Sequence, residues 1–261
     1  MKNYVISLTT ADTRRQHITQ EFGKQNIAFE FFDAITPKDI DELAVKFNPY
    51  LKDSTLLTDG EKACFLSHVC LWQKMIDDDL DYMAVFEDDV YLGENAGVFL
   101  ADAGWLDGLG IDYLKTETFL QERKLAKDAI NLPDNRIAKI LREPHLGTAG
   151  YIISKQIAKS LLDFIQQLDT HALKPIDHLM FEEYSKTKTV MPIYQMLPAI
   201  VAQEFILYPN RDILPSDLKQ SRDQRVKNKP KRPLSAKIKG ELSNAYRKTF
   251  GKMVRTLVEF R

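Results

Sequence analysis

One segment constrains the fold of this chain more than any other, the nine residues Tyr82–Val90, YMAVFEDDV. Five apolar or aromatic residues run directly into three consecutive carboxylates, Glu87, Asp88 and Asp89. A run of this length and composition is typical of a buried strand, with the acids at its carboxyl end. In an open α/β sheet that end is where ligands bind.

The three acids predict a metal site. Adjacent carboxylates repel one another unless positive charge lies between them, and Mg²⁺ or Mn²⁺ commonly bridges carboxylates to a substrate diphosphate. Alternation along a strand places Glu87 and Asp89 on one side and Asp88 on the other. We therefore expect Asp89 to bind the metal, Glu87 to complete the shell or face a nucleotide, and Asp88 to cap a turn. The alternative is a polar turn with all three acids solvated.

Length and composition indicate one α/β domain with an appendage. The chain has 261 residues, 44% of them hydrophobic and 28% charged, an ordinary globular composition. No run approaches the about 20 apolar residues that span a membrane, and Val5–Leu8 is too short for the core of a signal peptide. Cys64 and Cys70 fall on different faces of one predicted helix, which indicates a reducing, cytoplasmic location.

The net charge of −1 hides a strong asymmetry. Residues 211–261 hold 15 Lys/Arg against 5 Asp/Glu, whereas residues 1–210 hold 21 against 32. We therefore predict a main domain over residues 1–210, followed by a basic linker and helical tail over residues 211–261. Apolar spacing from Ala236 to Phe260 predicts an amphipathic helix in that tail.

Basic amphipathic helices bind anionic membrane surfaces, so we expect the tail to associate peripherally with a membrane. The tail lacks the aromatic platform that nucleic-acid binding favours, and we expect no nucleic-acid partner. The remaining alternative is a solvated tail, or a helix packed on the acidic main domain.

Strands and helices are predicted to alternate through about residue 200, which favours a mostly parallel sheet with helices on both faces. Thr58 with Glu61 forms a capping-box pattern, Ser154 suits an N-cap, and Pro175 suits a first helical position. The predicted strands are Asn3–Leu8, Ala28–Phe32, Tyr82–Phe86, Ile111–Thr116, Arg136–Leu141 and Thr148–Ile153, and the predicted helices are Asp12–Gln25, Pro37–Phe47, one from Thr58 to the run Asp77–Asp79, Ser154–Leu168 and one from Pro175.

Several short motifs acquire meaning from their combined order. They are Tyr4–Leu8 with Arg14 and Arg15, Phe32–Ala34, Gly60–Cys64 with Ser67, His68 and Trp72, Phe86–Val90, Gly147–Ser154, and Pro175–Asp177. Together, over residues 1 to about 200, they resemble the family 25 glycosyltransferases, the bacterial lipooligosaccharide sugar transferases related to collagen galactosyltransferases.

The resemblance implies a GT-A fold: a Rossmann-like, mixed and mostly parallel sheet flanked by helices. It also implies a nucleotide-sugar donor, transfer with inversion at the anomeric carbon, and a divalent metal, Mn²⁺ or Mg²⁺, at Glu87-Asp88-Asp89. We expect a UDP-sugar carrying galactose or glucose, and a lipooligosaccharide or lipopolysaccharide core acceptor. The enzyme would then work in the cytoplasm, peripherally on the inner face of the inner membrane.

Donor contacts are expected after the first two strands. Arg14 and Arg15 follow the first strand, and a guanidinium can hold phosphate oxygens bidentately; the alternative is a solvated first helical turn. Asp33 ends the second strand and is expected to accept a hydrogen bond from uracil or ribose, unless it only forms a turn before Pro37. The resemblance adds Ser7, Leu8, Ser67, His68, Glu87 and Asp88 to the expected donor site.

Two further positions have structural alternatives. His68 lies on the apolar stripe of its helix, where a histidine is more often a core residue than a ligand contact, and Trp72 is expected in the core. Gly147 and Gly150 flank Thr148, and small residues let a sugar approach the backbone closely. We therefore expect Gly147 and Thr148 to contact the acceptor or the sugar, the alternative being a tight entry to a strand.

The acceptor hydroxyl must lose a proton, which requires a general base. We expect Asp177 in this role, because the first turn of a helix stabilises an ionised carboxylate. The same location favours helix capping as the alternative, and His178 and His145 are reserve bases.

Two other classes of protein compete with a transferase. The first is a metal-dependent phosphatase or nuclease that uses Glu87-Asp88-Asp89. Against it, the first strand has no nucleophilic Asp and no lysine adjoins the acids. The second is a non-catalytic sugar-binding module, against which the intact acidic triplet argues.

Overall fold

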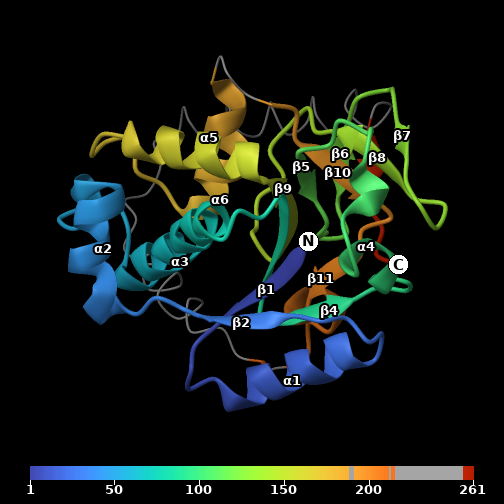
Figure 1. The fold of residues 1–261 in the computed structure, drawn as a ribbon, viewed down its shortest axis with the longest axis horizontal. Helices are drawn as coiled ribbons and strands as arrows, with labels where there is room; N and C mark the ends of the chain where they lie inside the picture. Colours follow the sequence, from blue (N-terminus) through green and yellow to red (C-terminus); the bar gives the residue numbers. More distant parts are fainter. Residues whose placement is uncertain (188–190, 212, 215–254) are drawn as a thin grey trace, which may run out of the picture.

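An eight-stranded sheet organises the computed structural model, which describes residues 1–187, 191–211, 213–214 and 255–261. The strand order is β2-β1-β3-β9-β5-β10-β8-β7 (Figure 1). The strands are β1 Lys2–Ser7, β2 Glu30–Asp33, β3 Tyr82–Glu87, β5 Tyr113–Lys115, β7 Ile130–Asn131, β8 Ile137–Ile140, β9 Gly150–Ser154 and β10 Tyr194–Leu197. Only β9 and β8 run against the other six strands, so the sheet is mixed and mostly parallel, as predicted.

Two short antiparallel pairs flank this sheet. In the first, β4 (Val90–Leu92) pairs with β11 (Val201–Gln203), and in the second, β6 (Glu122–Lys124) pairs with β12 (Arg255–Leu257). The first pair continues directly from the acidic end of β3 and therefore shapes the edge of the sheet at which Glu87, Asp88 and Asp89 lie.

Helices cover both faces of the sheet (Figure 1). Their bounds are α1 Asp12–Gly23, α2 Ile40–Phe47 after a 3₁₀ turn at Pro37–Asp39, α3 Asp59–Asp77, α4 Gly97–Leu100, α5 Lys155–Gln166, α6 Ile176–His178 and α7 Glu204–Leu207. After α6 the chain continues as a π turn, Leu179–Glu183, and a 3₁₀ turn, Tyr184–Lys186. No helix within these described ranges has both the length and the apolar content needed to cross a bilayer.

The alternation of β3 explains the two-sided core. Met83 and Val85 pack in one apolar cluster with residues of α3 and α5, whereas Ala84 and Phe86 pack in a second cluster with residues of α1 and α4. A strand that is apolar on both faces must be covered on both, so the sequence of β3 alone requires a three-layer arrangement. Trp72 is fully buried in the first cluster, as expected.

Both predicted helix caps are present. The Thr58 hydroxyl accepts a hydrogen bond from the Glu61 N–H at 3.2 Å, and the Glu61 carboxylate accepts one from the Thr58 N–H at 2.9 Å. Ser154 likewise caps α5 by accepting from the Ile157 N–H at 3.3 Å. The caps fix where α3 and α5 start. They thereby help to set the positions of β3, which follows α3, and of β9, which precedes α5.

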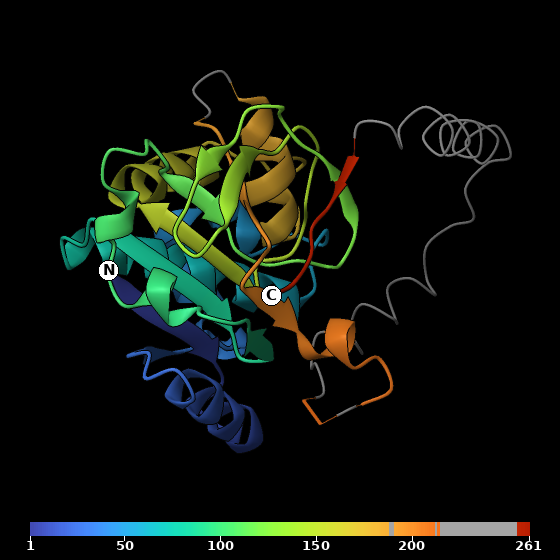
Figure 2. The ribbon, with the colours of Figure 1, turned by 90° about the vertical axis from the view of Figure 1, so that its right-hand side faces the viewer.

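The predicted C-terminal helix, Ala236–Phe260, is wrong over its last described residues. Arg255–Leu257 form β12, seen in red in Figure 2, and Val258 is fully buried against Leu125, Leu197 and Ala199. Backbone hydrogen bonds continue the contact, because Ala199 N–H donates to Glu259 and Arg261 N–H donates to Ala199. The end of the chain therefore packs on the main domain. Most of the predicted linker and helix, residues 215–254, lies outside the described residues.

Candidate active site

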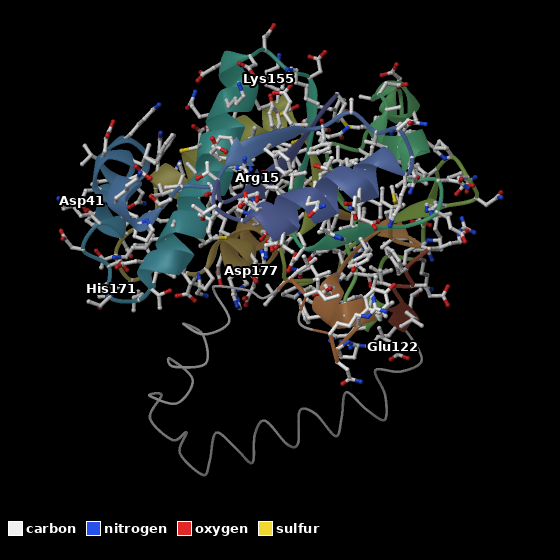
Figure 3. All side chains as sticks on the ribbon, turned by 90° about the horizontal axis from the view of Figure 1, so that it is seen from below. Arg15, Asp41, Glu122, Lys155, His171 and Asp177 are labelled. Atoms are coloured by element: carbon white, nitrogen blue, oxygen red, sulfur yellow. The ribbon has the colours of Figure 1, made fainter. Side chains whose placement is uncertain are left out.

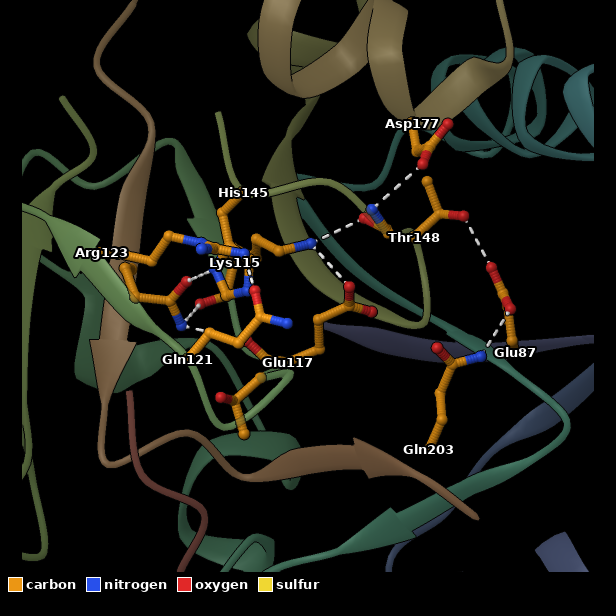
Figure 4. Close-up of polar contacts among 12 residues, drawn as sticks. Glu87, Lys115, Glu117, Gln121, Arg123, His145, Thr148, Asp177 and Gln203 are labelled. Carbon is orange, nitrogen blue, oxygen red and sulfur yellow. Dashed lines mark hydrogen bonds and ion pairs between the residues drawn. The ribbon is translucent and has the colours of Figure 1, made fainter. Parts of the chain in front are cut away.

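Glu87 and Asp89, at the carboxyl end of β3, face a common point. The Gln203 side-chain nitrogen Nε2 donates to Glu87 Oε2 at 3.2 Å and lies 3.0 and 3.1 Å from the two Asp89 oxygens. The other Glu87 oxygen accepts a hydrogen bond from Thr148 Oγ1 at 2.6 Å (Figure 4). Alternation along the strand thus places these two acids together, as the sequence predicts.

Asp88 points to the opposite side. Its carboxylate accepts a hydrogen bond from Ser7 Oγ at 2.7 Å and forms an ion pair with Arg14. The side chain is almost fully buried, so its charge is neutralised within the protein. Asp88 therefore ties the end of β3 to the start of α1, and it holds the Arg14 guanidinium beside the acidic edge.

The group formed by Glu87, Asp89 and Gln203 fits a divalent cation. Three carboxylate oxygens converge on one amide nitrogen, whose partly positive N–H groups occupy the position that a cation would favour. Burial raises the pKa of Asp89, while the hydrogen bond from Gln203 and the positive charge of Arg14 act against that shift. Mg²⁺ and Mn²⁺ often take only one or two protein carboxylates when substrate phosphates complete the shell. In the described part of the chain, no group of three or more His, Cys, Asp or Glu is arranged to bind a metal.

Gln203 is a site residue that sequence reasoning missed. It is the last residue of β11, and its register opposite Val90 brings its side chain to the acidic edge. A single glutamine far along the chain gives no local signal, because its position depends on a long-range strand pairing.

Gly147 has a backbone conformation that requires glycine. Its φ is +93°, and a Cβ atom at this position would lie 2.0 Å from Glu117 Oε1. Its N–H donates to Asp177 Oδ2 at 3.3 Å, and its carbonyl accepts from Lys115 Nζ at 2.6 Å. Together with the Thr148 hydrogen bond to Glu87, these contacts place Asp177 and the acidic edge at opposite ends of the Gly147–Thr148 dipeptide (Figure 4).

A buried ion pair supports this turn from below. Lys115 and Glu117 are fully buried, and Lys115 Nζ lies 2.8 Å from Glu117 Oε1 and 4.0 Å from the centre of the Phe181 ring. Burial lowers the pKa of Lys115 and raises that of Glu117, while the opposite charge of each partner acts against that shift. Sequence reasoning missed both residues, although a lysine at the end of an otherwise apolar strand was a visible signal.

Asp177 lies in α6 and is partly exposed. Its Oδ1 atom accepts from the His178 N–H at 2.9 Å, and Oδ2 accepts from Gly147 as above. In Figure 3 it lies toward the lower border of the described fold. These hydrogen bonds hold the side chain in place, and within the described residues Asp177 forms no ion pair.

The reserve base His145 is excluded by its surroundings. Its ring is fully buried, Nδ1 lies 2.7 Å from Gln195 Oε1, and burial lowers its pKa to about 2. A group with that pKa and no access to solvent does not accept a proton from a substrate. His178 is half-exposed and lies 2.9 Å from Glu182.

Ser67 and His68 lie in the core. His68 Nδ1 is 2.8 Å from the Tyr151 hydroxyl, which also accepts from Trp72 Nε1 at 3.1 Å, and burial lowers the pKa of His68 to about 3. Ser67 Oγ donates to Ala63 and accepts from the Ile35 N–H at 2.9 Å. Neither side chain has surface through which to meet a donor, so in this conformation both support the site from the core.

The remaining expected donor residues gather at the ends of β1 and β2. Arg15 donates to the carbonyls of Ser7 and Leu8, each at 3.0 Å, and pairs with the exposed Asp33 carboxylate. The structure thus brings Ser7, Leu8, Asp33 and both arginines to the same edge as Asp88.

Comparisons with known proteins identify the family of this chain. Residues 1–180 match the model of glycosyltransferase family 25 (LPS biosynthesis protein). The chain is 43% identical over 261 residues to the lipooligosaccharide biosynthesis protein lic2B of Haemophilus influenzae, covering 95% of this chain and 96% of that protein. It is 39% identical over 232 residues to the lacto-N-neotetraose biosynthesis glycosyltransferase LgtE of Neisseria gonorrhoeae, covering 86% and 82%.

Among solved structures, one similar chain is a glycosyltransferase involved in glycosylation of the major capsid of PBCV-1, with a TM-score of 0.41 and 9% identity over 78% of this chain and 93% of that one. The family match covers residues 1–180, which include Glu87, Asp89, Gly147, Thr148 and Asp177, and these two relatives cover 95% and 86% of the chain. The chain therefore belongs to glycosyltransferase family 25 and is a glycosyltransferase.

Proposed function

We propose that this enzyme transfers a hexose, galactose or glucose, from a UDP-sugar to a lipooligosaccharide or lipopolysaccharide core, with inversion at the anomeric carbon. The observation that carries the proposal is the placement of Glu87 and Asp89 on one side of the Gly147–Thr148 dipeptide and Asp177 on the other. The names of the relatives, which refer to lipooligosaccharide synthesis, support the acceptor class.

The acidic edge is the proposed end for the leaving diphosphate. Asp89 and Glu87 would hold Mn²⁺ or Mg²⁺, which when bound stabilises the negative charge that develops on the diphosphate. Arg14, fixed by Asp88 beside this edge, adds a positive charge from the protein itself. Asp33 and the carbonyls of Ser7 and Leu8 lie where the nucleoside would extend.

Asp177 is the proposed general base. It takes the proton of the acceptor hydroxyl while the acceptor oxygen forms a bond to the anomeric carbon. In the same step the bond from that carbon to the diphosphate oxygen breaks, and UDP leaves toward the acidic edge. Attack from the face opposite the leaving group inverts the anomeric configuration.

The basic segment supports peripheral membrane association on the cytoplasmic face. Residues 215–254 contain 12 Lys/Arg and 3 Asp/Glu. Each basic residue near an anionic bilayer contributes about 1 kcal/mol of attraction. A glycolipid acceptor lies on such a surface, so this attraction would bring the active site to its substrate.

The first test is release of UDP from UDP-galactose and UDP-glucose, with and without Mn²⁺. We expect metal-dependent release by the wild type that is lost in Asp89→Ala and kept in Asp107→Ala, a control at an exposed aspartate. Equal release of UDP without metal by the wild type and by Asp89→Ala would refute the metal site. Release of inorganic phosphate would instead favour a phosphatase, cleavage of nucleic acid a nuclease, and binding of UDP-sugar without turnover on any acceptor a sugar-binding module.

A further inference from the structure

Two aromatic side chains border the candidate active site and have no role in the proposed chemistry. Phe119 and Phe205 lie with ring centres 6.1 Å apart and planes inclined by 52°. Phe205 is 51% exposed, the only phenylalanine among the described residues that is more than a third exposed, and Phe119 is half-buried. Two inclined rings open to solvent form an apolar surface at an otherwise polar site.

The backbone on both sides of this pair is fixed. Thr118 N–H donates to Val201, and the Thr118 hydroxyl accepts from the Leu120 N–H at 2.8 Å, so Phe119 is held between two anchored residues. Phe205 follows Glu204, whose N–H donates to the Asp89 carbonyl at 2.9 Å. Backbone anchored in this way needs little ordering when a ligand binds.

The position of the pair indicates which ligand it meets. A Cβ atom on Gly147 would lie 2.7 Å from the Phe119 ring, so Phe119 packs directly on the residue whose N–H binds Asp177. Phe205 lies two residues after Gln203, which binds Glu87 and Asp89. Phe119 thus adjoins the residue that binds the proposed base, Phe205 adjoins the acidic edge, and the pair lies next to the proposed point of transfer.

We propose that Phe119 and Phe205 form the subsite for the sugar ring of the acceptor that carries the attacking hydroxyl. This inference rests on the proposed function, because Asp177 as the base places the acceptor ring within one sugar length of Gly147. Pyranose rings have apolar C–H faces that pack on aromatic rings, while their hydroxyls remain free for polar contacts. The pair thereby selects the acceptor and leaves the donor untouched.

The test uses UDP-sugar as donor and, as acceptor, lipooligosaccharide isolated from a strain in which this gene is deleted. We expect Phe205→Ala to raise the KM for this acceptor on the order of tenfold. The KM for the donor and the acceptor-free hydrolysis of UDP-sugar should remain at wild-type values. Phe205→Tyr should restore the acceptor KM, and Val45→Ala, a 70% exposed position on α2, is the matched control.

Phe119→Leu is the second variant and should likewise raise the acceptor KM, and the melting temperature of Phe205→Ala should match that of the wild type, because Phe205 is 51% exposed. An unchanged acceptor KM in Phe205→Ala, or an equal rise in the donor KM, overturns the inference while the proposed function stands. Absence of transfer by the wild type to this acceptor refutes the proposed function itself, and the inference with it.

Discussion

At the scale of single residues, Gly147 is the most demanding position of the site. Its positive φ and its contact with Glu117 leave no room for a side chain. We expect Gly147→Ala to lower kcat at least about 100-fold, because it displaces the N–H bound to Asp177 and the neighbouring Thr148. A steady-state assay measures this, with Gly23→Ala as control, since a Cβ at Gly23 meets nothing within 4 Å. Wild-type kcat in the Gly147 variant would contradict this role.

A substitution at Asp177 can distinguish a role in proton transfer from a structural role. Asp177→Asn keeps an oxygen that can accept from the Gly147 N–H but removes the base. We therefore expect kcat to fall about 10²- to 10⁴-fold while the melting temperature and the donor KM stay unchanged. A variant with a normal kcat would exclude Asp177 as the base and return attention to His178.

The two buried histidines predict a pH dependence of stability. Burial lowers the pKa of His68 to about 3 and that of His145 to about 2, whereas both titrate near 6.5 in an unfolded chain. Above that pH neither state binds the proton. Below it only the unfolded state does, so the free energy of unfolding falls as the pH drops toward the folded pKa values. At pH 5 each buried histidine should lower the free energy of unfolding by about 2 kcal/mol relative to pH 7.

Urea unfolding at a series of pH values measures this loss. His68→Asn keeps a hydrogen-bonding atom near the Tyr151 hydroxyl but cannot titrate. Below about pH 6 it should therefore reduce the slope of the unfolding free energy against pH by the equivalent of about one proton taken up on unfolding. An unchanged slope would mean that His68 is protonated in the folded protein.

Residue-scale expectations from sequence succeeded where the signal was local. Glu87 and Asp89 face together because strand geometry dictates it, whereas the expected contact of Gly147 with a sugar stays a prediction. Gln203 was missed because only a long-range strand pairing brings it to the site, and Lys115 and Glu117 were missed although Lys115 ends an otherwise apolar strand. His68 shows the opposite problem, because a histidine within a matched motif proved to lie in the core.

At the scale of elements, the cap of α3 carries a measurable share of stability. Thr58→Ala removes the acceptor of the Glu61 N–H, and we expect a loss of about 1 kcal/mol in the free energy of unfolding. Thr13→Ala, at an exposed position on α1, should stay within about 0.5 kcal/mol of the wild type. Equal effects of the two substitutions, measured by urea unfolding, would refute the capping role.

Helices and central strands were predictable because each has a strong local pattern. The apolar run of β3, the capping box of α3 and the Ser154 cap of α5 all specify their elements without tertiary information. The last residues were mispredicted because the apolar positions near the end fit both helical and alternating patterns. Val258 packs in the core of the main domain, and this tertiary contact favours a strand over a helix.

At the scale of the molecule, the described residues on either side of the basic segment, Leu214 and Arg255–Leu257, both contact the main domain. Leu214 N–H donates to Glu204 at 2.8 Å, its carbonyl accepts from Arg14 at 3.2 Å, and β12 pairs with β6. A deletion of 218–250, joined by a short Gly/Ser linker, should therefore keep the fold and the donor hydrolysis.

The same deletion should weaken binding to vesicles of phosphatidylglycerol and phosphatidylethanolamine by at least about 100-fold, because most of the basic charge is lost. Vesicle sedimentation measures this, with phosphatidylcholine vesicles as the control. Full binding by the deletion variant would assign the membrane contact to another surface.

The double anchoring also means that the last seven residues, Arg255–Arg261, dock through an intramolecular contact. If an engineered protease site within 218–250 were cut, docking would become a bimolecular association that depends on the concentration of the freed strand. The enzyme could then be rebuilt from two pieces. The activity of the larger piece would then increase with the concentration of an added synthetic peptide that carries residues 255–261.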